Sequence, residues 1–339
     1  MRVTPVLDPP TPAPDHRPVR VLDSGTVAEL LDPDALLSAV ATAMVDLSHG
    51  RASLPPRIAA RVEGAGLLAT MPAYSPTAGV LAAKLLTVYL GNAAAGHPVH
   101  QAAIAVFDPP TGRLRALVAG DLLTAARTAA CSALSVRHLA RPDARVLAVL
   151  GTGPQAREHA RYAARVHPFG EVLVAGRDPD KAAALARELD LPARPTTLAE
   201  AVAAADVVCA ATSTVAPILR DGEVRPGTHI ASVGYIPDGR EVDAAVLREA
   251  LLAVEHRATT LAPFPTGSND LAELLERDEI AREDVVEIGE LVAGDHPGRS
   301  DAERITVFKS VGVAVQDAAA AAAVLAAAER AGAGTDVAL

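Results

Sequence analysis

The stretch VLAVLGTGPQA, residues 146–156, contains residue types at the spacing of a dinucleotide-binding turn. Gly151, Gly153 and Ala156 form the pattern G-x-G-x-x-A directly after an apolar run and directly before a helical segment. The first glycine permits a tight bend, the second lets the backbone approach a pyrophosphate, and the alanine lets the helix lie close to the strand. Backbone amides at the start of the helix would then hold the phosphates. The pattern predicts a cofactor site, with a purely structural turn as the alternative.

The end of the next predicted strand bears on which dinucleotide binds. An NAD site usually places an Asp or Glu there to bind the ribose 2′-hydroxyl, whereas this chain continues from Gly176 to Arg177. A guanidinium can hold a 2′-phosphate with two parallel hydrogen bonds. Asp178 could instead bind the hydroxyl, and Arg177 could be an ordinary surface residue. We predict that NADP(H) is favoured over NAD(H).

Strands and helices alternate from Arg145 onward, which indicates βαβ units and a doubly wound parallel sheet. Strands are predicted at 145–150, 171–177, 206–212, 228–234 and 250–255, with helices at 154–166 and 179–189. Further cofactor contacts are expected from the glycine turn and from positions that follow later strands: Thr152, Gln155, Thr212, Ser232, Val233 and Ser310.

The residues before Arg145 predict a mixed sheet with flanking helices. Helices are predicted at 32–50, with Asp32 as the N-cap, and at 121–140. Strands are predicted within 64–75, 79–91 and 101–120, and the last range contains a hairpin turn at DPPTG. From Ile305, a strand and a long helix are expected to return to the first domain or to close the cleft between the domains.

Length and composition restrict the class of protein. With 339 residues, the chain exceeds the size that one hydrophobic core usually organises, so two domains are expected. A net charge of −10 argues against a nucleic-acid partner and gives no support to binding of an anionic membrane. Cys131 and Cys209 lack metal-ligand spacing, which predicts no metal site and two free thiols in a reducing, cytoplasmic compartment. The proline-rich residues 1–22 are expected to form a flexible tail.

Three stretches together resemble the ornithine cyclodeaminase and mu-crystallin family: residues 126–160, which join ARTAA to GTGPQA, then GREVD at 239–243 and VFKSVGVAVQDAAAA at 307–321. The similarity extends from about Leu54 to Ala328. It implies an α/β fold in which a Rossmann domain is inserted into a second α/β domain that binds substrate and forms a homodimer. On this basis, residues 126–304 are assigned to the Rossmann domain and residues 23–125 plus 305–339 to the substrate-binding domain.

The resemblance also implies a set of substrate-binding residues. The family's carboxylate-binding cations correspond to Arg57 in LPPRI, Lys84 in AAKLL and Arg127 in ARTAA. Two guanidiniums and an ammonium in a cleft of low dielectric would hold a carboxylate strongly. Lys84 is a candidate proton donor, provided that burial and the nearby arginines lower its pKa. His100 is a further candidate for substrate binding and for supplying the proton.

The loop SVGYIPDGREVD differs from the cyclodeaminase pattern. Tyr235 and Ile236 stand where a cyclodeaminase carries its proton-handling Asp, and Gly239 stands where it carries a Lys. Asp238 is the carboxylate within the loop, and it is either catalytic or a turn-forming residue. This departure favours an oxidoreductase that reduces an imine or ketimine carboxylate, or that interconverts an amino acid and its 2-oxo acid. The alternatives are an ornithine-type cyclodeaminase and a non-catalytic binder of small carboxylates.

Overall fold

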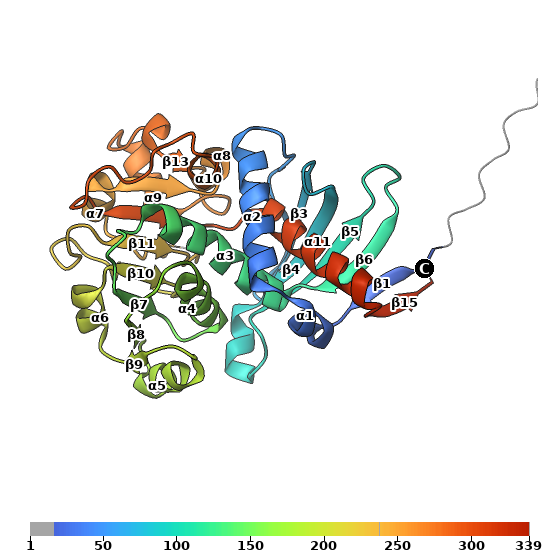
Figure 1. Cartoon of the computed structure of the whole chain (residues 1–339), viewed down its shortest axis with the longest axis horizontal. Helices are drawn as coiled ribbons and strands as arrows, with labels where there is room; N and C mark the ends of the chain where they lie inside the picture. Colours follow the sequence, from blue (N-terminus) through green and yellow to red (C-terminus); the bar gives the residue numbers. More distant parts are fainter. Residues whose placement is uncertain (1–16, 237, 339) are drawn as a thin grey trace, which may run out of the picture.

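The computed structural model describes residues 17–236 and 238–338, and these residues form two sheets with their own helices (Figure 1). The first sheet has the strand order β15 (Thr335–Val337), β1 (Val19–Leu22), β6 (Leu114–Ala119), β5 (His100–Phe107), β4 (Val80–Val88), β3 (Gly66–Ser75) and β2 (Ile58–Val62). Its neighbouring strands are antiparallel except for β1 and β6. The helices packed on it are α1 (Ser24–Leu30), α2 (Pro33–Ser48), α3 (Asp121–Leu139) and α11 (Ala314–Ala331).

The second sheet is parallel throughout, which confirms the predicted doubly wound sheet. Its strand order is β13 (Val286–Glu287), β12 (Leu251–Val254), β14 (Thr306–Lys309), β11 (His229–Ser232), β10 (Val207–Ala210), β7 (Val146–Leu150), β8 (Glu171–Ala175) and β9 (Ala193–Pro195). The helices between these strands are α4 (Pro154–Val166), α5 (Pro179–Glu188), α6 (Leu198–Ala204), α7 (Ala244–Glu249), α8 (Arg257–Thr260), α9 (Asn269–Glu276) and α10 (Ile288–Ala293). Two short 3-10 helices, η1 (Leu90–Ala95) and η2 (Arg282–Asp284), complete the described chain.

Local sequence signals account for several element boundaries. The Asp32 carboxylate accepts hydrogen bonds from the backbone N–H groups of Asp34 and Ala35, so it caps α2 as predicted. Gly50 follows the end of this helix with φ +66°, a conformation that suits glycine. In the predicted hairpin turn between β5 and β6, Gly112 also has a positive φ, at +71°.

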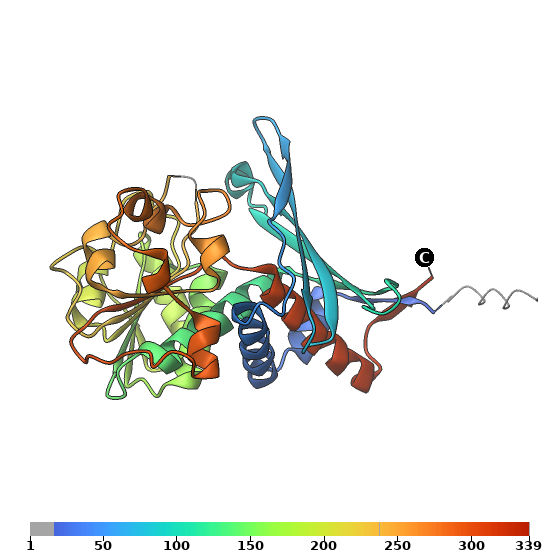
Figure 2. The ribbon, with the colours of Figure 1, turned by 90° about the horizontal axis from the view of Figure 1, so that it is seen from above.

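Two long helices connect the sheets (Figures 1 and 2). α3 is buried along most of its length and packs against α2 on one side and against α4 on the other. Because half of its buried positions are Ala or Ser, neighbouring helices can approach it closely. Four residues separate the end of β14 from the start of α11, and α11 packs against β3, β4 and β5. The chain therefore passes directly from the parallel sheet to the mixed sheet through residues 310–313.

The structure corrects two details of the predicted organisation. Residues 19–22 were expected in a flexible tail, but they form β1 with Val19 and Leu22 buried; residues 1–16 of that tail lie outside the described residues. The strand predicted from Ile305 was assigned with the first domain, but β14 lies between β11 and β12 in the parallel sheet. All four of its residues are buried, as expected for a strand paired on both sides.

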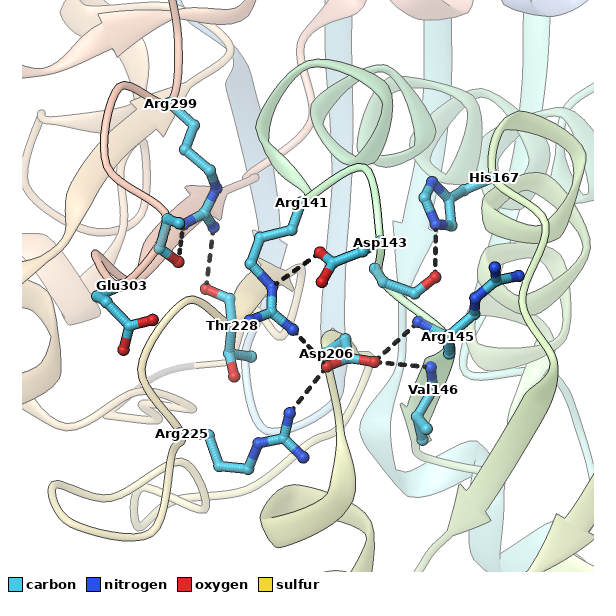
Figure 3. Close-up of polar contacts among 12 residues, drawn as sticks. Arg141, Asp143, Arg145, Val146, His167, Asp206, Arg225, Thr228, Arg299 and Glu303 are labelled. Atoms are coloured by element: carbon cyan, nitrogen blue, oxygen red, sulfur yellow. Dashed lines mark hydrogen bonds and ion pairs between the residues drawn. The ribbon is translucent and has the colours of Figure 1, made fainter.

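The amino end of the parallel sheet is held by one carboxylate, that of Asp206, which directly precedes β10 (Figure 3). This carboxylate accepts hydrogen bonds from the backbone N–H groups of Arg145 and Val146, at 2.8 and 3.0 Å. It also forms ion pairs with Arg141 and Arg225, each at 2.8 Å. The start of β7 is thereby fixed beside β10, at the opposite end of β7 from the glycine turn.

The described residues contain neither a membrane-spanning helix nor a cluster of potential metal ligands. No helix among them is long and apolar enough to cross a membrane. Within the same residues, no group of three or more His, Cys, Asp or Glu side chains is placed to hold a metal ion. Cys131 and Cys209 are buried and free.

Candidate active site

The glycine turn between β7 and α4 has the geometry that a pyrophosphate needs. Gly151 has φ +123°, and a Cβ atom there would lie 2.4 Å from the backbone oxygen of Ala211. Gly153 is the N-cap of α4, no side chain caps the helix, and a Cβ at Gly153 would meet no atom within 4 Å. The buried Ala156 lies against Gly151, which brings α4 close to β7. The turn therefore leaves the uncapped amides of α4 open at the carboxyl edge of the sheet, where a dinucleotide phosphate fits.

The residues that follow β8 differ in their hydrogen bonds and ion pairs. Arg177 is exposed and makes no hydrogen bond or ion pair with any described residue. Asp178 is the N-cap of α5, and its Oδ1 atom accepts hydrogen bonds from the backbone N–H groups of Asp180 and Lys181. A Cβ at Gly176 would lie 2.7 Å from the side chain of Thr152, so the turn and the end of β8 are in close contact. Arg177 and Asp178 are the two candidates for contacting the ribose 2′ position. Of the two, Arg177 is the one without a hydrogen-bond or ion-pair partner among the described residues.

Three hydroxyls predicted to contact the cofactor are hydrogen bonded to buried glutamates. The Thr212 and Ser232 hydroxyls donate to Glu241, at 2.6 and 2.7 Å, and the Ser310 hydroxyl donates to Glu255. The backbone N–H of Val233 donates to the Ala210 oxygen, and the half-buried Gln155 has a side-chain oxygen without a partner among the described residues. The three hydroxyl protons and the Val233 N–H are therefore already engaged within the protein.

The sequence did not reveal Glu241, Glu255, Asp270 and Lys309, which are buried at this edge. Glu241 also accepts hydrogen bonds from the backbone N–H groups of Thr212 and Gly234, and so joins the loops after β10 and β11. Lys309 forms an ion pair with Asp270 at 2.8 Å. Glu255 accepts hydrogen bonds from the backbone N–H groups at 311 and 312. The sequence did offer one signal for such residues. A charged residue that ends an apolar strand, or directly follows it, lies at the carboxyl edge of a parallel sheet.

The structure brings Lys84 and Arg127 together on a third residue. Lys84 comes from β4 and Arg127 from α3, and both contact the carboxylate of Asp317 in the first turn of α11. The Lys84 Nζ–Asp317 distance is 2.9 Å, and the Arg127 Nε–Asp317 distance is 2.8 Å. Arg127 Nη1 also donates to the side-chain oxygen of Gln316 at 2.6 Å. Asp317 was not predicted, although an Asp within an Ala-rich helix was a visible signal.

Arg57 reaches the same place from the loop before β2. Its Nη2 atom donates to the backbone oxygens of Val311 and Gly312, at 3.3 and 3.2 Å. Gly312 has φ +74°, and a Cβ there would lie 2.7 Å from Arg127 Nη1. Both guanidiniums therefore lie against Gly312, on the segment that leaves the parallel sheet. The three predicted cations, Arg57, Lys84 and Arg127, are assembled around this crossing.

Burial controls the ionisation of the side chains in this cluster. Desolvation lowers the pKa of Lys84 to about 8; Asp317 opposes that shift, while Arg127 and Arg57 add to it. Burial, assisted by the charge of Lys84, also lowers the pKa of His100. His100 Nδ1 lies 3.7 Å from Asp121. Lys84 can therefore exchange its proton near neutral pH, as a general acid must.

The loop after β11 presents an aromatic ring to Arg57. The Arg57 guanidinium lies over the ring of Tyr235, 5.4 Å from its centroid, and the Tyr235 hydroxyl donates to the Pro265 oxygen. Asp238 is exposed, has φ +57°, and makes no hydrogen bond or ion pair with a described residue. This geometry is typical of a turn-forming Asp. A catalytic role for Asp238 has no support from its contacts.

A parallel sheet with an open glycine turn, beside a buried cluster of cations contributed in part by a second sheet, is typical of a nucleotide-binding α/β protein. The chain belongs to the ornithine cyclodeaminase/mu-crystallin family, whose model matches residues 19–332.

Relatives and solved structures agree with this membership. The chain is 38% identical over 258 residues to ketimine reductase mu-crystallin of Mus musculus, which covers 76% of this chain and 79% of that one. It is 38% identical over 242 residues to iminosuccinate reductase of Paracoccus denitrificans, which covers 70% and 74%. The Thermococcus litoralis Delta(1)-pyrroline-2-carboxylate reductase in complex with NADH and L-proline superposes with a TM-score of 0.89 at 31% identity, covering 94% of this chain and all of that one.

The two glycines of the turn should respond differently to alanine. Gly151→Ala should lower the melting temperature, because its positive φ and the nearby Ala211 oxygen both oppose a Cβ. Gly153→Ala should leave the melting temperature near that of the wild type but weaken NAD(P)H binding by about tenfold. Thermal unfolding and fluorescence titration with each cofactor measure the two effects. Unchanged cofactor affinity in Gly153→Ala would remove this turn from the cofactor site.

Proposed function

We propose that this protein is an NAD(P)H-dependent imine reductase whose substrate carries a carboxylate next to the C=N bond. The supporting observation is the convergence of Arg57, Lys84 and Arg127 around residues 311–317, directly after the last strand of the cofactor sheet. Relatives named as ketimine, iminosuccinate and pyrroline-2-carboxylate reductases support the same class.

Each side chain has a separate part in this proposal. Arg57 and Arg127 bind the carboxylate of the substrate and thereby orient its imine carbon. When bound, the reduced nicotinamide supplies a hydride to that carbon. Lys84 donates a proton to the imine nitrogen, since its pKa of about 8 leaves it protonated but labile at neutral pH. Tyr235 packs on Arg57 at the position where a cyclodeaminase carries a proton-handling carboxylate, which favours reduction over cyclodeamination.

The reaction class is tested by mixing the protein with NADPH or NADH and a panel of cyclic imine carboxylates, or of 2-oxo acids with amines. We expect loss of reduced cofactor in equal amount to the amine formed. Ammonia release from ornithine without net cofactor change would instead identify a cyclodeaminase. Tight binding of the carboxylates without turnover would identify a binding protein.

The proton-donor role of Lys84 predicts a specific pH dependence. Wild-type kcat/KM should fall above about pH 8, because the free enzyme loses its general acid as Lys84 deprotonates. Lys84→Ala should lower kcat by about 100-fold or more and remove this basic limb. Lys84→Arg should not restore activity, because a guanidinium keeps its proton at neutral pH.

Arg57→Ala serves as the matched comparison, and should mainly raise KM by about 10-fold or more through loss of a charge-assisted hydrogen bond. If Lys84→Ala changes only KM and keeps the basic limb, Lys84 is a third carboxylate anchor. The proton would then come from His100, from water or from a substrate that is already an iminium.

We propose NADPH as the favoured cofactor, supported by the unengaged Arg177 and by the N-cap role of Asp178. Arg177→Ala should weaken NADPH binding by about tenfold or more and change NADH binding little, because only NADPH carries the 2′-phosphate. Arg187→Ala, another exposed arginine on the adjoining helix α5, should leave both affinities unchanged. Equal losses for the two cofactors in Arg177→Ala would contradict the preference.

We also propose a homodimer formed through the outer face of the mixed sheet, in a cytoplasmic protein whose two thiols stay free. α2 and α11 lie on one side of this sheet (Figure 2), and the opposite face carries Ile58, Leu68 and Leu85 at 69%, 47% and 42% exposure. Ile58 and Leu85 both pair with Thr70 of β3, so they share one face of the sheet. An archaeal alanine dehydrogenase of 28% identity and TM-score 0.86 is described as a dimer.

Light scattering at micromolar concentration should therefore give the mass of a dimer. Leu85→Asp should shift the protein towards monomer, because a charge would be buried in an apolar interface. Val215→Asp, at an equally apolar and 67% exposed position outside the mixed sheet, should remain dimeric. A monomeric wild type would contradict the proposal.

A further inference from the structure

The Asp317 carboxylate contacts both buried cations of the proposed substrate site, Lys84 and Arg127, and has no part in the reaction described above. It is 1% exposed, and its partners Lys84 and Arg127 are 2% and 3% exposed. The three residues come from α11, β4 and α3. One carboxylate thus links three elements at the point where the substrate carboxylate is expected.

We propose that Asp317 is a positioning residue for imine reduction, which holds the Lys84 ammonium and the Arg127 guanidinium in the orientation that the substrate requires and supplies the negative charge that balances them. This inference rests on the proposed function. The role of Asp317 differs from that of Arg57 and Arg127, which bind the substrate carboxylate. It also differs from that of Lys84, which donates the proton.

The charges that face Lys84 show why one carboxylate matters. Lys84 pairs with Met71 of β3 and Ile104 of β5 across the sheet, so its strand neighbours are apolar. Arg127 from α3 and Arg57 from the loop before β2 are positive, and His100 from β5 lies within electrostatic reach, paired with Asp121. Among the described residues acting on Lys84, Asp317 is the negative one. Without it, the largest charge effects on the ammonium would be those of the positive Arg127 and Arg57, in a desolvated site.

The proton balance distinguishes Asp317 from Lys84. The N–H bond of the Lys84 ammonium breaks as a new N–H bond forms at the imine nitrogen, while the hydride from the reduced nicotinamide forms the C–H bond. Asp317 stays ionised throughout, because Arg127 and Lys84 together outweigh the effect of burial and lower the pKa of this carboxyl. It therefore orients and balances charge but transfers no proton.

Asp317→Asn tests the proposal, because the amide keeps the shape of the side chain and removes its charge. With the charge gone, the basic limb of the kcat/KM–pH profile should move to lower pH by about 1–3 units, since an opposite charge at this distance shifts a pKa by that amount. NADPH affinity by fluorescence should stay within twofold of wild type, which shows that the variant is folded. Glu329→Gln removes an ion pair with Arg115 at the far end of the same helix and should leave the profile unchanged.

A basic limb that stays at its wild-type pH in a folded, active Asp317→Asn would overturn this inference and leave the proposed function intact. A wild type that reduces no imine would overturn the proposed function, and this inference with it. Should Asp317→Asn not fold, Asp317→Glu moves the charge by one methylene group and is measured in two backgrounds. It should lower kcat by about tenfold in the wild-type background and by clearly less in the Lys84→Ala background, where only the contact with Arg127 remains; equal losses in both would overturn the inference.

Discussion

The pairing of Lys84 and Arg127 with the buried carboxylate of Asp317 fixes how the two sheets can meet. A charged side chain at 2% exposure is tolerated only when an opposite charge or a hydrogen bond compensates for lost hydration. Because Lys84 is in β4, Arg127 in α3 and Asp317 in α11, a shift of any of these elements would leave a buried charge without its partner. The helices that connect the sheets are therefore held in place by this buried cluster of charges.

The same principle organises the carboxyl edge of the parallel sheet. Glu241 binds backbone and side-chain donors of the loops after β10 and β11, and Asp270 binds Lys309 and the backbone N–H of Glu241. Glu255 holds the backbone N–H groups that begin the crossing to α11. Loops at this edge must be rigid to orient a nicotinamide ring, and buried carboxylates give them fixed hydrogen-bond partners. The amino edge uses Asp206 in a corresponding way.

Periodicity and turn chemistry were enough to predict the parallel sheet, the mixed sheet and the glycine turn, because these depend on local patterns. The position of β14 could not be predicted, since Thr306–Lys309 is a short buried strand that would suit either sheet. Family resemblance located Arg57, Lys84 and Arg127, but it did not supply their partners. Asp317 lies more than 180 residues beyond Arg127, and nothing in the local sequence indicates which cation it faces.

The charge of the buried cluster connects its geometry to the proposed binding of an anion and to the proposed proton transfer. Arg57, Arg127 and protonated Lys84 carry three positive charges against the single negative charge of Asp317, an excess of two. A substrate carboxylate reduces this excess to one, which favours binding in a desolvated site. In the proposed reaction, transfer of the Lys84 proton to the imine nitrogen then removes the last excess charge from these side chains and the bound carboxylate. The lowered pKa of Lys84 follows from the same imbalance, so the arrangement that binds the anion also prepares the lysine to give up its proton.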